Sequence, residues 1–250
     1  MAFFYYDESI RDKGGFIVGA LVVSDVDLTF EVRKAWLALG LDPETNEYKS
    51  SDIKNNNVIG QKQRDVLRVL LSGSRLGLFV CSKARRDFLG DGCAMLILQL
   101  LQKKMLAPGQ HKVYLDQNME LSPELRQRLL EAGVTPLLHQ DSRVVAGLQV
   151  ADHAAHALGG MLLEQMGLAN KKIMAGEGSG YDPQTKVELG FELWAGLRYS
   201  LIGRNKDEEN NANPYLQVDG FGLLLDPQLS PELCAHSLEL FGINYVGCIH

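Results

Sequence analysis

The sequence predicts an α/β protein whose mixed sheet opens with a β-hairpin, carries helices on both faces and continues into a mainly helical C-terminal extension. Two β-rich runs, residues 3–9 and 14–25, are joined by a short polar turn that contains Gly14 and Gly15, which is typical of an antiparallel hairpin. After the hairpin, strand-like and helix-like segments alternate along the chain. Beyond residue 167 both patterns weaken, which sets the extension apart from the α/β core.

Apolar residues recur at the spacing of amphipathic helices in five segments before residue 167, and short β-rich runs lie between them. The predicted helices are 28–39, 61–73, 93–106, 122–133 and 143–167. The predicted strands after the hairpin are 75–83, 112–118 and 134–141, with a further short strand at the start of the polar connection 46–56. Gly73 and the Pro108-Gly109 pair stop two of the helices, and Ser122 followed by Pro123 begins a third.

The last part of the chain is expected to be a helical extension, residues 168–250, packed on a core domain of residues 1–167. Its segments are a Gly-rich stretch at 175–183, a helix at 186–203, a polar linker at 205–214 and a helix within 221–242. The GEGSG sequence in the Gly-rich stretch is not a phosphate-binding loop, because it lacks the Gly-Lys-Ser/Thr ending and does not join a strand to a helix.

The composition excludes several classes of protein. With 250 residues, 46% of them hydrophobic, the chain can bury a substantial core. No apolar run reaches the roughly 18 residues needed to cross a bilayer, and the start has no basic segment typical of a signal peptide, so we expect a cytoplasmic protein. The four cysteines are far apart and form no C-x-x-C pair, which argues against a zinc knuckle and a disulfide scaffold.

Charge is segregated along the chain although the net charge is only −6. Residues 49–112 hold 12 Lys and Arg against 4 Asp and Glu, so the middle is basic and the remainder is acidic. The KARR sequence, with Lys83, Arg85 and Arg86, is the candidate nucleic-acid-binding segment, because clustered cations can bind phosphate groups. The alternative is that these cations belong to an ordinary solvated surface.

Acidic residues end two of the predicted strands. Asp7 and Glu8 follow an aromatic run, and Asp116 closes the strand at 112–118. Strand ends meet at one crevice in an α/β sheet, so Asp7 and Asp116 can face each other if their strands are neighbours. For Asp7 and Glu8 two readings stay open: a solvated strand end, or the first ligands of a metal site.

A third acid lies in the long predicted helix. Asp152 is surrounded by apolar residues in sequence, so its carboxylate must be paired, capped, liganded or directed into a cleft. His156 follows four residues later and projects from the same face of the helix. An Asp/His pair at this spacing can hold a divalent ion or orient an attacking water; the alternative is a core or surface histidine.

Several segments in order resemble the family called domain of unknown function 3800, which is regarded as ribonuclease-H-like. The resemblance covers roughly residues 3–160. It is carried by FYYDES at the start, Glu47-Tyr48-Lys49, VYLD at the end of a later strand and DSRVVAGLQVAD before the long helix. It implies a ribonuclease-H-like mixed sheet flanked by helices, an acidic cluster of Asp7, Asp116 and Asp152, and Glu8, Glu47 and Lys49 nearby.

The resemblance also implies a chemistry. Carboxylates in ribonuclease-H-like enzymes hold two Mg²⁺ or Mn²⁺ ions, and oxygen ligands suit these hard cations. Lys49 would either contact a scissile phosphate or pair with Glu47. The expected function is therefore a metal-dependent phosphodiester hydrolase, a nuclease with a nucleic-acid partner. The alternative is an inactive nucleic-acid- or partner-binding module, such as a component of a defence or mobile-element system; the sequence does not decide oligomeric state.

Overall fold

The computed structural model describes residues 1–52, 57–175, 181–198, 200–202 and 222–241. The predicted linker at 205–214, the GEGSG core of the Gly-rich stretch and Cys248 lie outside these residues. Within the described ranges, no helix combines the length and the apolar character that crossing a membrane requires.

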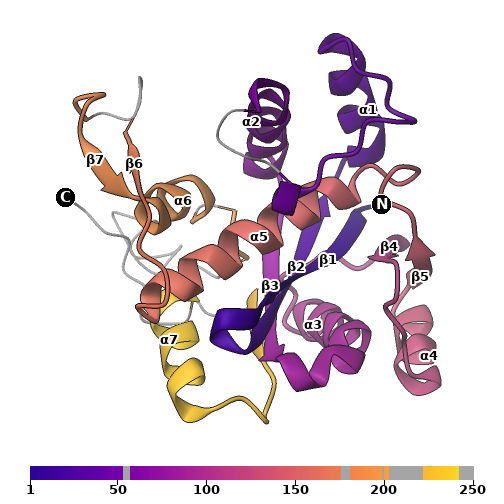
Figure 1. The fold of residues 1–250 in the computed structure, drawn as a ribbon. Coiled ribbons are helices and arrows are strands. Elements are labelled where there is room, and N and C mark those ends of the chain that lie inside the picture. The colour runs from indigo at the N-terminus through magenta and orange to yellow at the C-terminus, as the bar shows by residue number, and fades with distance from the viewer. Residues whose placement is uncertain (53–56, 176–180, 199, 203–221, 242–250) are drawn as a thin grey trace, which may run out of the picture.

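A six-stranded mixed sheet forms the centre of the fold, with the order β5-β4-β1-β2-β3-β8 (Figure 1). Its strands are β1 (Phe3–Arg11), β2 (Phe16–Ser24), β3 (Arg75–Ser82), β4 (His111–Asp116), β5 (Val134–Gln140) and β8 (Leu223–Leu225). The first three strands form an antiparallel meander, and β4 and β5 run parallel to β1. This arrangement confirms the predicted opening hairpin and the ribonuclease-H-like mixed sheet.

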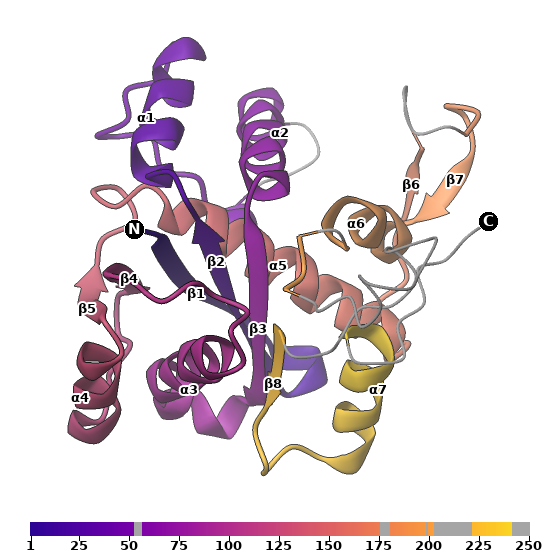
Figure 2. The same cartoon turned by 180° about the vertical axis from the view of Figure 1, so that it is seen from behind.

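Helices cover both faces of the sheet. They are α1 (Leu28–Ala38), α2 (Val58–Ser72), α3 (Leu89–Gln102), α4 (Pro123–Glu131), α5 (Leu148–Gln165), α6 (Leu189–Leu197) and α7 (Pro231–Phe241). One buried cluster joins α1, α2, α5, α6 and α7 to the sheet, and a second joins α3 and α4 to the opposite face. Figure 2 shows α3 and α4 on the side of the sheet away from α5.

Several predicted elements differ from the structure. No strand forms at the start of the 46–56 connection, where residues 46–49 have no regular structure and lead to a 3₁₀ turn, Ser50–Asp52. α3 begins at Leu89, four residues before the predicted start, because a 3₁₀ segment leads directly into it. α5 begins at Leu148 rather than residue 143, because turns held by Asp141 occupy the preceding residues.

The C-terminal extension also contributes strands, which the sequence analysis missed. The predicted helix at 186–203 begins as strand β7 (Lys186–Glu188), which pairs with β6 (Lys172–Met174), and only then continues as α6. β8 runs parallel to β3 and so extends the central sheet. The division into a core domain and an extension at residue 167 remains a prediction. One strand of the extension, β8, belongs to the same sheet as the core strands.

Helix α5 lies directly along β1, and two glycines make this close packing possible. A Cβ atom on Gly147 would lie 2.2 Å from Cε1 of Tyr5, and one on Gly159 would lie 2.5 Å from Nε of Arg11. The 12 helical steps between these glycines span about 18 Å, and the six strand steps from Tyr5 to Arg11 span about 20 Å. The helix and the strand therefore stay in register along this seam, and the candidate site lies within it.

Candidate metal centre

Asp7 and Asp116 lie at the point where β1 and β4 separate. Tyr6 and Leu115 form the last pair of these parallel strands, so each acid is the next residue on its strand. One carboxylate oxygen from each of Asp7, Glu8 and Asp116 lies within 4.8 Å of the other two. The structure therefore brings together the two acids that were predicted from the strand ends.

The third member of this close group is Glu8, whereas the sequence analysis expected Asp152. Oε1 of Glu8 accepts a hydrogen bond from Nη2 of Arg86 at 3.1 Å. Its Oε2 is buried and has no hydrogen-bond partner among the described residues. An unpaired buried carboxylate oxygen is unfavourable, so Oε2 has an open position for a cation or a donor group.

Burial and mutual repulsion raise the pKa of these acids. Asp7 is only 7% exposed, and burial followed by the charges of Asp116, Asp152 and Glu8 raises its pKa well above the ordinary value. Burial raises the pKa of Asp116 to about 6, with the charge of Glu8 acting in the same direction and Lys49 opposing it. Arg86 and Lys49 offset this repulsion only in part, so the three crowded acids are a strained arrangement that a divalent cation would relieve.

Asp152 projects from α5 toward the same region but has its own hydrogen bond. Its Oδ2 accepts from the backbone N–H of Ser50 at 2.8 Å. Burial raises the pKa of Asp152, and the hydrogen bond from Ser50 partly offsets this rise. Asp152 is close enough for its charge to act on Asp7 and Asp116, but it is not in the 4.8 Å group, so its role as a metal ligand remains a prediction.

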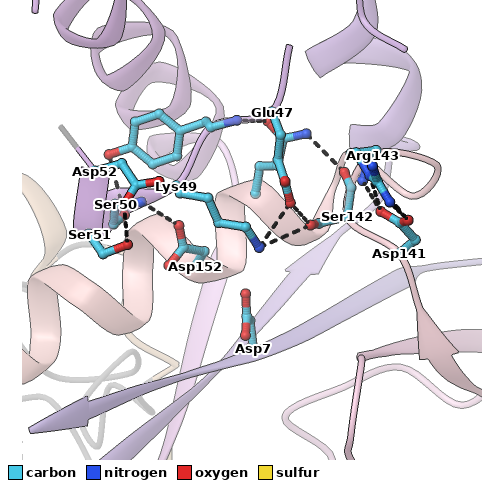
Figure 3. A network of polar contacts seen from close by, with 12 residues as sticks. Asp7, Glu47, Lys49, Ser50, Ser51, Asp52, Asp141, Ser142, Arg143 and Asp152 are labelled. Carbon is cyan, nitrogen blue, oxygen red and sulfur yellow. Dashed lines mark hydrogen bonds and ion pairs between the residues drawn. The ribbon is translucent and has the colours of Figure 1, made fainter. Parts of the chain in front are cut away.

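Glu47 and Lys49 form one network with Ser142 beside the acids, and Figure 3 shows Asp7, Lys49 and Asp152 directed toward a common space. Lys49 Nζ lies 2.9 Å from Glu47 Oε1, and the Ser142 hydroxyl also donates to Glu47. Burial lowers the pKa of Lys49, but Glu47, Asp116 and Asp7 outweigh it and the pKa is raised. The predicted Glu47 pairing is present, and the Lys49 charge still acts on the acidic cluster.

Gln149 holds this loop against α5, and the sequence analysis did not identify it. Its Oε1 accepts from the backbone N–H of Tyr48 at 2.9 Å and from Nε1 of Trp36 at 3.3 Å. Its Nε2 donates to the carbonyl of Ser142 at 2.9 Å. A polar side chain in an otherwise apolar stretch, GLQVA, was the signal available in the sequence, because a buried amide needs several partners.

His156 is not brought into the acidic group by the structure. Its backbone carbonyl accepts from Nη2 of Arg11, and its side chain lies on the part of α5 beyond Asp152. Burial lowers the pKa of His156 to about 4, with Arg11, Arg64 and Lys171 adding to the effect. The imidazole is thus surrounded by cations, which is unlike the surroundings of a carboxylate-rich metal ligand.

Each of the three predicted nucleic-acid-binding cations is paired with a carboxylate. Lys83 pairs with Asp12, Arg85 with the fully buried Asp226 side chain at 3.3 Å, and Arg86 with Glu8 at 3.1 Å. Arg85 also lies over the ring of Phe88, 4.4 Å from its centroid. These contacts give the segment a structural role, and its binding of nucleic acid remains a prediction.

The donor set at the strand ends fits a hard divalent cation. All candidate ligands are carboxylate oxygens, and one of them, Oε2 of Glu8, is buried without a partner among the described residues. Oxygen-only sites favour Mg²⁺, Mn²⁺ and Ca²⁺ over metals that prefer nitrogen or sulfur. The residues present are therefore suitable for the predicted type of ion.

No protein-family model matches the chain, and no curated protein matches it. Among solved structures, a chain of the complex of PCNA with RNase HII from Archaeoglobus fulgidus is 16% identical, with a TM-score of 0.39. The match covers 73% of this chain and 83% of that chain. The ribonuclease-H-like assignment of the fold depends on the strand order and directions described above.

Proposed function

We propose that this chain is a divalent-metal-dependent phosphodiester hydrolase, a nuclease, whose centre comprises Asp7, Asp116 and Asp152 together with Glu8. The single observation that supports this most strongly is the convergence of the Asp7, Glu8 and Asp116 carboxylates where two parallel strands part. Membership of the domain of unknown function 3800 family is part of the same proposal.

The carboxylates would hold Mg²⁺ or Mn²⁺, with two ions expected. Such ions activate water and stabilise the charge on the leaving oxygen in phosphodiester hydrolysis. Asp7 and Asp116 are fixed by neighbouring strands, and Ser50 fixes the orientation of Asp152 through a backbone hydrogen bond. These positions limit side-chain motion, so little reorganisation is needed when substrate binds.

Lys49 would contact a phosphate oxygen next to the centre. Its ammonium group has a raised pKa and therefore stays charged at neutral pH. Glu47 and Ser142 orient it by direct contacts, and its charge already acts on Asp7 and Asp116. A fixed cation here would offset the repulsion between the acids and an approaching polyanion.

A cleavage assay tests the proposal. The purified chain is incubated with fluorescent single-stranded and double-stranded DNA and RNA, and with an RNA–DNA hybrid, in Mg²⁺ or Mn²⁺. We expect the native chain to cleave at least one substrate and Asp116→Asn to cleave none. Circular dichroism and thermal unfolding should show that Asp116→Asn is folded. Absence of cleavage on every substrate in both metals would contradict the proposal, and binding without cleavage would favour the inactive binding module.

A further inference from the structure

A group of basic side chains lies next to the acidic cluster, farther along the seam between β1 and α5. Nη2 of Arg11 donates to the carbonyl of His156, and the guanidinium lies against Gly159. Nε of Arg11 is buried and has no hydrogen-bond partner among the residues that the structure describes. The absence of a side chain at Gly159 thus allows a half-buried cation to lie across the helix.

Arg64 on α2 approaches the same part of α5 from the other side. Its charge acts on both His153 and His156. With Arg68 and His153 it also lines an open cavity of about 620 Å³ between α2, α5, α6 and the strand β6. The remaining lining is apolar apart from Asp65, Ser72 and Glu192, and it includes Ile173, Met174 and Leu193.

These arginines differ from the other cations near the site in their partners. Arg85, Arg86 and Arg68 each have a carboxylate within 4.0 Å. Over the described ranges of the chain, Arg11 and Arg64 form no ion pair at that distance, although both are half-buried. Arg64 has a hydrogen bond with Tyr48, and the charge of Asp152 acts on Arg11 from a greater distance. A partly desolvated cation without a carboxylate is unfavourable, and a bound anion would compensate for it.

The spacing relates this basic group to the acidic cluster. Asp7 and Arg11 lie on the same face of β1, four residues and about 13 Å apart. Asp152 and His156 are one helical turn apart, with a rise of about 6 Å. An extended polyanion with one phosphate at the acids would therefore place neighbouring phosphates beside Arg11, His156 and Arg64.

We propose that Arg11, Arg64 and His156 bind backbone phosphates of a nucleic-acid strand next to the acidic cluster, and that the cavity beside α2 receives unpaired nucleotides of that strand. The choice of nucleic acid rests on the proposed nuclease function. Of the two arginines in the cavity, Arg68 is paired with Glu192, so Arg64 is the cation that can bind a phosphate. The apolar side chains of the cavity wall can pack against the faces of bases.

The test is fluorescence anisotropy with a labelled single-stranded oligonucleotide of about 12 nucleotides. All proteins carry Asp116→Asn, so that the oligonucleotide stays intact and the comparisons are matched. Arg64→Gln should weaken binding about tenfold at low salt and reduce the slope of log K against log salt by about 0.7. The control is Arg126→Gln, an exposed arginine on α4 on the opposite face of the sheet, which should change neither quantity.

Arg11→Gln provides a second variant, with urea unfolding as a check because Arg11 packs against α5. If it does not fold, Arg64→Gln and the charge reversal Arg64→Glu decide the question. Equal affinity and salt slope for Arg64→Gln and its parent, or no binding by the parent, would overturn the inference. If binding depends on Arg64 but the native chain shows no metal-dependent cleavage, the result supports this inference and contradicts the nuclease function. If the native chain cleaves nucleic acid but binding does not depend on Arg64, the result supports the nuclease function and contradicts this inference.

Discussion

Gly147 at the start of α5 lies against the ring of Tyr5 on β1, and an added Cβ atom would be 2.2 Å from Cε1 of that ring. Tyr5 and its strand neighbours Phe4 and Tyr6 are fully buried, so the ring cannot move away easily. We expect Gly147→Ala to lower the free energy of unfolding by about 1–3 kcal/mol, the usual cost of overpacking a core. Urea unfolding followed by circular dichroism measures this change.

Gly160 on the same helix is the matched control. The nearest atom to a Cβ at this position is Cδ1 of Leu193 at 4.0 Å, which leaves room for the methyl group. Gly160→Ala should be neutral or stabilise the fold by up to about 1 kcal/mol, because alanine is the better helix former. Equal effects of the two substitutions would contradict the close packing of β1 and α5.

Gln149 should be needed for the position of the loop that carries Glu47 and Lys49. Gln149→Leu keeps a similar volume but leaves Tyr48 N–H, Trp36 Nε1–H and the Ser142 carbonyl without their partner. Since each buried polar group left unpaired costs about 1–3 kcal/mol, we expect a loss of at least about 2 kcal/mol in the free energy of unfolding. A loss smaller than about 0.5 kcal/mol in denaturant titration would show that this network does not order the loop.

Two of the three ion pairs of the KARR segment, those of Arg85 and Lys83, should differ in their effect on stability. Arg85 pairs with Asp226, whose side chain is fully buried, so Arg85→Gln should destabilise the fold by about 1–3 kcal/mol. Lys83→Gln breaks a pair in which the side chains are 55% and 75% exposed, so its effect should stay below about 1 kcal/mol. Thermal unfolding of both variants compares them, and a larger effect for Lys83→Gln would contradict the structural role assigned to Arg85.

Ionisation of Asp116 should lower the stability of the metal-free chain as the pH rises. The pKa of Asp116 is raised from 3.8 to about 6 in the folded state, so above pH 3.8 the unfolded chain loses this proton before the folded chain does. Unfolding is then favoured progressively until the folded carboxyl also ionises near pH 6, and the raised pKa of Asp7 extends the loss to higher pH. The lowered pKa values of His153 and His156 act in the opposite direction over the same range. Thermal unfolding in chelator between pH 4 and 6 should therefore show a stability that falls more, or rises less, for the native chain than for Asp116→Asn. The same pH dependence in both proteins would contradict the assigned strain.

The sequence predicted the parts of the centre that follow from strand ends, and missed those that depend on local departures from regular structure. Asp7 and Asp116 were predicted because acids that end neighbouring strands meet at one edge. Glu8 was left open between a solvated strand end and a metal ligand, and the family resemblance placed it only near the cluster; alternation along a strand directs its side chain to the face opposite Asp7. The structure brings Asp7 and Glu8 into one group with Asp116 where β4 ends and β1 continues with β2 as its only neighbour in the described sheet.

Other features depend on contacts between distant residues, which sequence patterns do not encode. The KARR segment appeared free to bind phosphate because its partner Asp226 lies 141 residues later in the chain. The strands β6, β7 and β8 have only three residues each, too few to show the alternation of a strand. Arg11 and Arg64 lie far apart in the sequence, and only the packing of β1 and α2 on α5 brings them together.

Direct binding of Mn²⁺ tests the central claim that the carboxylates of Asp7, Glu8 and Asp116 form a divalent-cation site. Electron paramagnetic resonance measures free Mn²⁺ as the ion is titrated into the metal-free native chain and into Asp116→Asn at equal concentration. We predict that the native chain removes Mn²⁺ from solution with saturation, and that Asp116→Asn, shown to be folded, binds much more weakly. Free Mn²⁺ that follows the buffer blank at every concentration of the native chain would contradict the claim.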